Sequence, residues 1–125
     1  MQPVEGIDNA ARVLVVDDSG LFRRAARHVL VEAGFEVVGD AEDGATALRL
    51  VEELRPDVVL LDIQLPDQDG FQVAARLRRA ADPPAIVFVS SRSRWDYGGM
   101  VERSGARGFL DKTDLSGPLL REMLG

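Results

Sequence analysis

The sequence predicts an α/β domain in which one doubly wound, five-stranded parallel sheet is flanked by five helices. Five short β-rich runs recur along the chain, and a helix-like segment follows each of them. Alternating strands and helices form right-handed βαβ units, and such units build a parallel sheet. The chain has 125 residues, of which 46% are hydrophobic, so it has the size of a single domain and can supply a core.

The five strands are expected at residues 12–16, 35–39, 57–61, 85–89 and 108–110. The first, third and fourth runs are apolar except for Arg12 and Asp57 at their first positions, which is typical of strands buried on both faces of a parallel sheet. The second run is less continuous, and we therefore expect it at an edge of the sheet.

Apolar residues at helical spacing follow each strand, and cap and breaker residues set their limits. The first helix is expected to begin near Ser19 and to end at Gly34, because glycine is favoured just past a helix end. The others are expected to begin near Asp43, Asp69, Trp95 and Ser116, and Pro56 and the Asp82-Pro83-Pro84 stretch close the second and third. The segment at 95–104 is the weakest, because Gly98 and Gly99 lie inside it and each costs about 1 kcal/mol relative to Ala.

Composition and charge exclude several classes of function. The net charge is −6, so the domain is not expected to bind nucleic acid directly. The absence of cysteine excludes disulfides and thiolate metal sites. Residues 1–11 are expected to be a polar leader without the apolar core of a signal peptide, and the apolar runs are too short to cross a bilayer. We expect a cytoplasmic protein with no membrane partner.

Polar residues stand where four of the predicted strands end. Asp17 and Asp18 follow the first strand, Asp62 the third, Ser90 the fourth, and Lys112 closely follows the fifth. In open α/β sheets the functional site lies beyond the carboxyl ends of the strands. Each of these residues alone is more simply explained as a loop or surface residue, but their joint placement predicts a site.

This combination of residues favours phosphoryl chemistry. Crowded carboxylates repel one another unless a cation or a proton joins them, and Mg²⁺ prefers carboxylate, water and phosphate oxygens. A carboxylate can also attack as a nucleophile and form an acyl phosphate, whose oxygens a metal and a lysine would neutralise. Lys112 is the only lysine among 15 basic residues, which suggests that its position requires an ammonium group.

These stretches resemble the receiver domains of two-component response regulators. The resemblance rests on VLVVDDS at Asp17 and Asp18, VVLLDIQLPDQDG at Asp62, IVFVSS at Ser90, and GARGFLDK with Phe109 and Lys112. It covers residues 12–125, which we take as the receiver domain, and it implies the flavodoxin-like strand order 2-1-3-4-5.

The resemblance implies a role for each residue of the site. Asp62 would be the phosphoacceptor and would bind Mg²⁺, or Mn²⁺, directly together with Asp18 and the backbone carbonyl of Gln64. Asp17 would act on the metal through a water molecule.

A second group of residues would handle the phosphoryl group and the switch. Ser90 and Lys112 would hold phosphoryl oxygens, and Phe109 would turn inward when Ser90 moves. Three residues close to the acceptor and to Ser90 are expected to tune the phosphoryl lifetime: Gln64, Ser91 and Arg92.

By the same resemblance the chain is a signalling switch and not an enzyme with a substrate of its own. It would take its phosphoryl group from the phosphohistidine of a sensor histidine kinase or a phosphotransfer protein. The surface of the fourth helix, fifth strand and fifth helix, with Trp95, Tyr97 and Phe109, would then address an output domain or protein. Trp95 is expected to report activation. The formation of a dimer on phosphorylation is an alternative that the sequence leaves open.

The sequence departs from the family pattern at two positions. Thr113 follows Lys112 where many receivers have proline, and Phe109 replaces a common tyrosine and so lacks its hydroxyl. The stretches EVVGDAEDG and KTDL resemble receivers that precede a helix-turn-helix domain, so transcriptional regulation is the expected output of a longer regulator. The alternatives are a constitutive pseudo-receiver and an aspartate-phosphate hydrolase. The hydrolase is disfavoured because Gln64 stands where its second Asp is needed.

Overall fold

The computed structural model describes residues 10–125, and its strands and helices alternate as predicted. The strands are β1 (Arg12–Val16), β2 (Glu36–Ala41), β3 (Val58–Asp62), β4 (Ala85–Ser90) and β5 (Gly108–Asp111). The α-helices are α2 (Gly20–Glu32), α3 (Gly44–Leu54), α4 (Gly70–Leu77), α5 (Met100–Arg103) and α6 (Gly117–Leu124), and the 3-10 helices are η1 (Arg94–Tyr97) and η2 (Lys112–Asp114). The predicted leader, residues 1–11, lies outside the described residues except for its last two.

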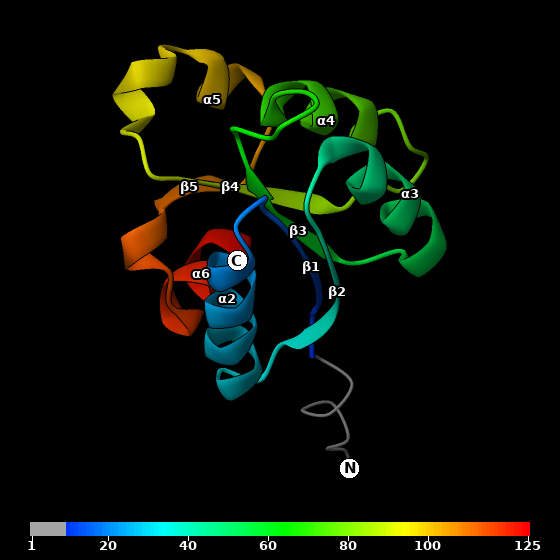
Figure 1. The fold of residues 1–125 in the computed structure, drawn as a ribbon, viewed down its shortest axis with the longest axis vertical. Helices are drawn as coiled ribbons and strands as arrows, with labels where there is room; N and C mark the ends of the chain where they lie inside the picture. Colours follow the sequence, from blue (N-terminus) through cyan, green and yellow to red (C-terminus); the bar gives the residue numbers. More distant parts are fainter. Residues whose placement is uncertain (1–9) are drawn as a thin grey trace.

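All five strands are parallel and lie in the order β2-β1-β3-β4-β5, which confirms the predicted fold class and the edge position of β2 (Figure 1). The bounds of β1 were predicted correctly, and those of the other four strands are wrong by one or two residues. Strand β3 reaches Asp62 and β4 reaches Ser90, because the parallel ladder continues through the pairs Asp62 with Val89 and Ser90 with Asp111. Two site residues are therefore held by the sheet itself and not by a loop.

Helices α2 and α6 cover one face of the sheet, and α3, α4 and α5 cover the other (Figure 1). Successive side chains of a strand point to opposite faces, so Val13 and Val15 pack with α2 and α6 while Leu14 and Val16 pack with α3 and α4. Nearly every residue of β1, β3 and β4 is buried. The two apolar layers make the strand ends a rigid platform. No helix in residues 10–125 is long and apolar enough to span a bilayer.

The predicted caps fix the helices that flank the site. The hydroxyl of Ser19 accepts a hydrogen bond from the Phe22 amide at 3.2 Å and begins α2 directly after the acidic pair. Asp69 and Gln72 form a reciprocal capping box at the start of α4. Gly34 adopts φ +94°, which confirms its place just past the end of α2.

The fourth helix was predicted as one segment over 95–104, and this is wrong. The chain forms η1 up to Tyr97 and starts again as the four-residue α5 at Met100. Gly98 has φ 59° and ψ −135°, a conformation that only glycine adopts readily, so a continuous helix cannot pass through it. Helix α4 also stops at Leu77, earlier than its proline boundary suggests, and a turn follows.

Candidate functional site

The carboxyl ends of four strands bring the predicted site residues together. Asp17, Asp62 and Ser90 have relative exposures of 0%, 4% and 1%, and they are the only polar side chains that are buried in residues 10–125. Asp18 is exposed at the rim, and Lys112 is half-buried. Burial of polar and charged groups is costly unless partners or ions compensate it, so two carboxylates and a hydroxyl buried at one edge indicate a functional requirement.

Lys112 links the two buried carboxylates. Its Nζ lies 2.7 Å from Asp17 Oδ2 and 3.5 Å from Asp62 Oδ2. One carboxylate oxygen from each of Asp17, Asp18 and Asp62 lies within 4.8 Å of the others. When all are ionised, three carboxylates face one ammonium, which leaves two negative charges in excess.

The electrostatic cost of this arrangement appears in the pKa values. Burial, followed by the charge of Asp17, raises the pKa of Asp62 from 3.8 to about 6, although Lys112 and the Gln64 amide act in the opposite direction. Burial alone would lower the pKa of Lys112, but the close contact of its ammonium with Asp17 and the charges of Asp62 and Asp17 raise it overall. Lys112 therefore stays protonated at neutral pH.

The donor set fits a hard divalent cation. Asp17 Oδ2 is fully buried and accepts no aligned hydrogen bond, although the Lys112 ammonium is near enough to form an ion pair. Two excess negative charges match one divalent ion, and carboxylate oxygens are the ligands that Mg²⁺ selects. The Gln64 amide donates to Asp62 Oδ1 at 3.2 Å, so the loop after β3 folds back over the acceptor carboxylate.

Two residues outside the predicted site hold the acidic loops in place. Arg23 of α2 donates from Nη1 to the Asp17 carbonyl oxygen at 2.8 Å and pairs through Nε with Asp40 at 3.3 Å. Gly70 lies against the end of β3, where an added Cβ would come within 2.5 Å of the Asp62 carbonyl oxygen. Nothing in the sequence indicated the role of Arg23, because a contact with the loop before the helix leaves no periodic signal.

Ser90 has partners that the sequence did not predict. Its Oγ accepts a hydrogen bond from the Arg92 amide at 3.0 Å and shares a second one of 2.8 Å with the Tyr97 hydroxyl, in which either oxygen can donate. Tyr97 was expected on the surface that addresses a partner, and here it is half-buried, with its ring 6.1 Å from that of Phe109. The sequence contains no signal for this contact.

The expected tuning residues are all exposed at the rim of the site: Gln64, Ser91 and Arg92. For Gln64 and Arg92 the bond to a site residue is made by the backbone amide. The side chains of Gln64 and Arg92 are therefore not tied to a site residue. Phe109 is half-buried and packs beside Tyr97.

Comparison with known proteins points to one family. The family model for the response regulator receiver domain matches residues 13–123. The solved signal receiver domain of the response regulator NarL from Mycobacterium tuberculosis is 36% identical and superposes with a TM-score of 0.79, covering 92% of this chain and 97% of that chain.

Curated relatives carry this domain together with others. A protein-glutamate methylesterase/protein-glutamine glutaminase of Alkalilimnicola ehrlichii is 39% identical over 116 residues, which are 86% of this chain and 29% of the relative. The transcriptional regulatory protein DegU of Brevibacillus brevis is 35% identical over 106 residues, which are 84% of this chain and 45% of the relative. The chain spans less than half the length of either of these relatives.

Proposed function

The chain belongs to the response regulator receiver domain family, and from this premise we propose that Asp62 accepts a phosphoryl group in a Mg²⁺-dependent reaction that switches the surface of η1, α5, β5 and α6. A receiver of this kind is a signalling switch in a two-component system. The observation that carries the proposal is the buried pair of Asp17 and Asp62 joined by Lys112, with Asp18 at the rim.

Each residue of the site has its own role in phosphoryl transfer. Asp17, Asp18 and Asp62, with the backbone carbonyl of Gln64, would hold the metal, which supplies charge neutralisation for the phosphoryl oxygens when bound. Lys112 adds a second positive charge beside the two buried carboxylates. Ser90 offers a hydroxyl at the same edge of the sheet.

The chemical step is a displacement at phosphorus. An Asp62 carboxylate oxygen attacks the phosphorus atom of a phosphohistidine, the new O–P bond forms, and the P–N bond breaks. The imidazole nitrogen of the donor leaves with the electron pair and is neutral or takes up a proton from solvent. Hydrolysis later removes the group when water attacks the phosphorus atom, the O–P bond to Asp62 breaks, the carboxylate leaves with the electron pair, and inorganic phosphate is released with loss of a proton to solvent.

The partners follow from this chemistry. We propose a sensor histidine kinase or a phosphotransfer protein as the donor, which places the reaction in the cytoplasm. The output is a domain or protein that binds the switched surface. Because the relatives include a methylesterase and a transcriptional regulatory protein, we propose an output of one of these kinds. The domain itself then catalyses only its own phosphorylation and dephosphorylation.

Intact-mass spectrometry after treatment with acetyl phosphate and Mg²⁺ tests the proposal. We expect one phosphoryl adduct on the wild type, none on Asp62→Asn, and none when EDTA removes the metal. Asp82→Asn is the matched control, because Asp82 is exposed and precedes the amino end of β4, whereas the site lies at the carboxyl ends of the strands, and it should be modified like the wild type. An adduct that persists in Asp62→Asn would refute Asp62 as the acceptor.

A further inference from the structure

The hydroxyl of Tyr97 engages the one hydroxyl that the site needs for the phosphoryl group. Ser90 Oγ lies 2.8 Å from Tyr97 Oη and 3.0 Å from the Arg92 amide, so both of its neighbours outside the site come from the segment after β4. A serine hydroxyl has a single proton to donate. The position of Ser90 and the position of this segment are therefore coupled.

Tyr97 is the anchor of η1. Its ring packs edge-on against Phe71 at 5.7 Å and beside Phe109 at 6.1 Å. Trp95, the other aromatic residue of η1, is 81% exposed. Gly98 and Gly99 follow directly and give the chain a point at which it can bend.

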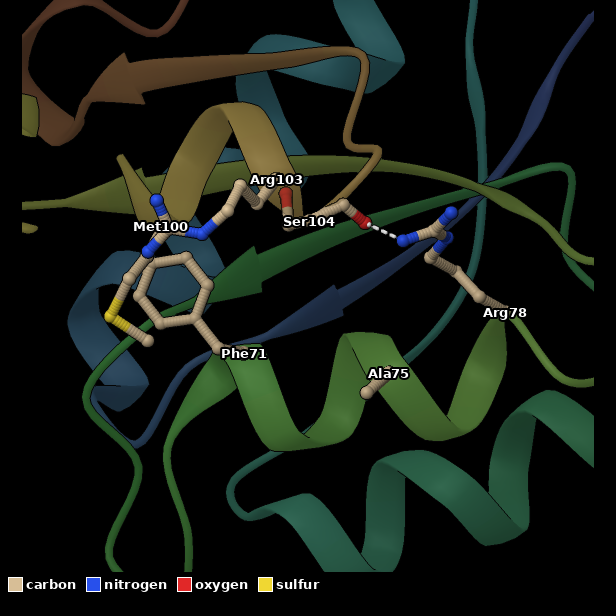
Figure 2. Close-up of a pocket in the computed structure, with 6 residues that line it drawn as sticks. All are labelled: Phe71, Ala75, Arg78, Met100, Arg103 and Ser104. Atoms are coloured by element: carbon tan, nitrogen blue, oxygen red, sulfur yellow. Dashed lines mark hydrogen bonds between the residues drawn. The ribbon is translucent and has the colours of Figure 1, made fainter. Parts of the chain in front are cut away.

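The neighbouring α5 is held loosely. It has four residues, and of these only Val101 is buried. A cavity of about 200 Å³ separates α5 from α4, lined by Phe71, Ala75 and Met100 among others, and the Arg78 guanidinium bonds the Ser104 carbonyl oxygen across it (Figure 2). Few apolar contacts give a segment a low opening free energy. Movement of η1 and α5 therefore disturbs little of the core.

We propose that Tyr97 is a positioning residue whose hydroxyl latches Ser90, and that phosphorylation of Asp62 releases this latch. An anionic phosphoryl oxygen accepts a hydrogen bond about twice as strong as a neutral phenol does. Ser90 accordingly turns its hydroxyl toward Asp62, and its contact with Tyr97 Oη breaks. The freed Tyr97 leaves its place between Phe71 and Phe109 and carries Trp95 with it.

The latch also accounts for the missing hydroxyl on β5. Phe109 has no group that can bond to Ser90 or to a partner, so among the aromatic residues around Ser90 only Tyr97 provides one. The release of Tyr97 opens space beside Phe109, into which that ring can turn. The latch presupposes the proposed function, because it acts on the phosphoryl chemistry of Asp62.

The chain has one tyrosine and one tryptophan, so each reports on itself alone. Protein with ¹³Cζ-labelled tyrosine should give one NMR resonance, and Ser90→Ala should move it before any activator is added. Mg²⁺ and beryllofluoride, a phosphoryl mimic, should move the wild-type resonance toward the Ser90→Ala position and change Trp95 emission. ¹⁹F NMR of bound beryllofluoride shows independently that the site is filled.

These readouts separate the latch from the proposed function. No bound ¹⁹F signal would contradict the phosphoacceptor site, whereas the comparison with Ser90→Ala would still test the hydrogen bond. A tyrosine resonance that is the same in the wild type and Ser90→Ala overturns the latch. A resonance that does not move although beryllofluoride is bound also overturns it.

Kinetics supply a second test. Tyr97→Phe keeps the ring and removes the hydroxyl, so it should raise the rate of phosphorylation by acetyl phosphate about three- to tenfold, the range expected for the loss of one neutral hydrogen bond. The same substitution in a Ser90→Ala background should have no effect, because the bond is already absent. Equal rates for the wild type and Tyr97→Phe, or the same acceleration in both backgrounds, would overturn the latch. Circular dichroism checks that all variants are folded.

Discussion

Replacement of Asp62 by Asn should stabilise the folded protein at neutral pH while it abolishes phosphorylation. Burial and the charge of Asp17 raise the pKa of Asp62 from 3.8 to about 6. The ionised carboxylate is therefore disfavoured in the fold, and its removal relieves this cost. Asn has nearly the same shape, so the packing at the end of β3 is preserved.

The size of this stabilisation follows from the change in the pKa of Asp62. The difference between 3.8 and about 6 corresponds to about 3 kcal/mol at pH 7, since each pH unit contributes about 1.4 kcal/mol. Screening by solvent and the lost contact with Lys112 reduce the net gain to about 1–2 kcal/mol.

The stability that Asp62→Asn gains over the wild type depends on pH. The folded state holds a proton on Asp62 up to about pH 6, whereas the unfolded chain loses it near 3.8. The folded state therefore binds more protons in this window, and wild-type stability falls as the pH rises through it. Asp62→Asn has no such group, so its advantage is full near pH 7 and shrinks toward pH 4.

Urea unfolding in EDTA buffer at several pH values measures this effect, with Asp82→Asn as a control that should match the wild type. Mg²⁺ should reduce the difference in stability between Asp62→Asn and the wild type, because it binds the wild-type carboxylates more tightly and so stabilises the folded wild type more than the variant. If Asp62→Asn is no more stable than the wild type at pH 7, with an unchanged urea dependence, the buried Asp62 carboxylate does not destabilise the fold and the prediction is wrong.

Three further predictions concern the surroundings of the acceptor. Lys112→Arg should slow phosphorylation by about tenfold or more, because a planar guanidinium cannot reproduce the compact contact to both carboxylates, and a normal time course by mass would contradict this. Gly70→Ala should lower the free energy of unfolding by about 1–3 kcal/mol, since its Cβ would meet the Asp62 carbonyl oxygen, and an unchanged urea midpoint would refute it. Gln64→Ala and Arg92→Ala should alter the rate of dephosphorylation, and wild-type phosphoryl lifetimes in both would exclude their tuning role.

The sheet could be predicted from the sequence because its signals are local. Apolar runs one strand long, each followed by a helical stripe with a cap, identify the elements, and a parallel sheet then gathers their carboxyl ends at one edge. That rule alone placed Asp17, Asp62, Ser90 and Lys112 together, as the structure shows. The strand bounds were wrong where a polar residue continues a ladder, since pairing with the neighbouring strand decides the last residue and is not a local property.

The contacts of η1 could not be predicted, because they depend on where a short loop packs. Gly98 lowers helix propensity in the sequence, but only the structure shows that it splits the segment and turns Tyr97 toward the site. A hydrogen bond across seven residues of irregular chain leaves no pattern in composition or periodicity. The contact of Arg23 with the acidic loop could not be predicted for the same reason, since its partner is a backbone carbonyl.

The site also explains why the surrounding sheet is so apolar. Asp17 and Asp62 are buried side by side, and their repulsion opposes folding until a cation or a proton compensates it. The fully buried strands β1 and β3 that carry them supply hydrophobic stabilisation at the same place, so the fold tolerates this cost. A protein that relieved the repulsion with Asn would be more stable but could neither bind the metal well nor accept the phosphoryl group. The instability of the acidic pair is therefore part of the proposed function, since it makes the site responsive to the arrival of positive charge.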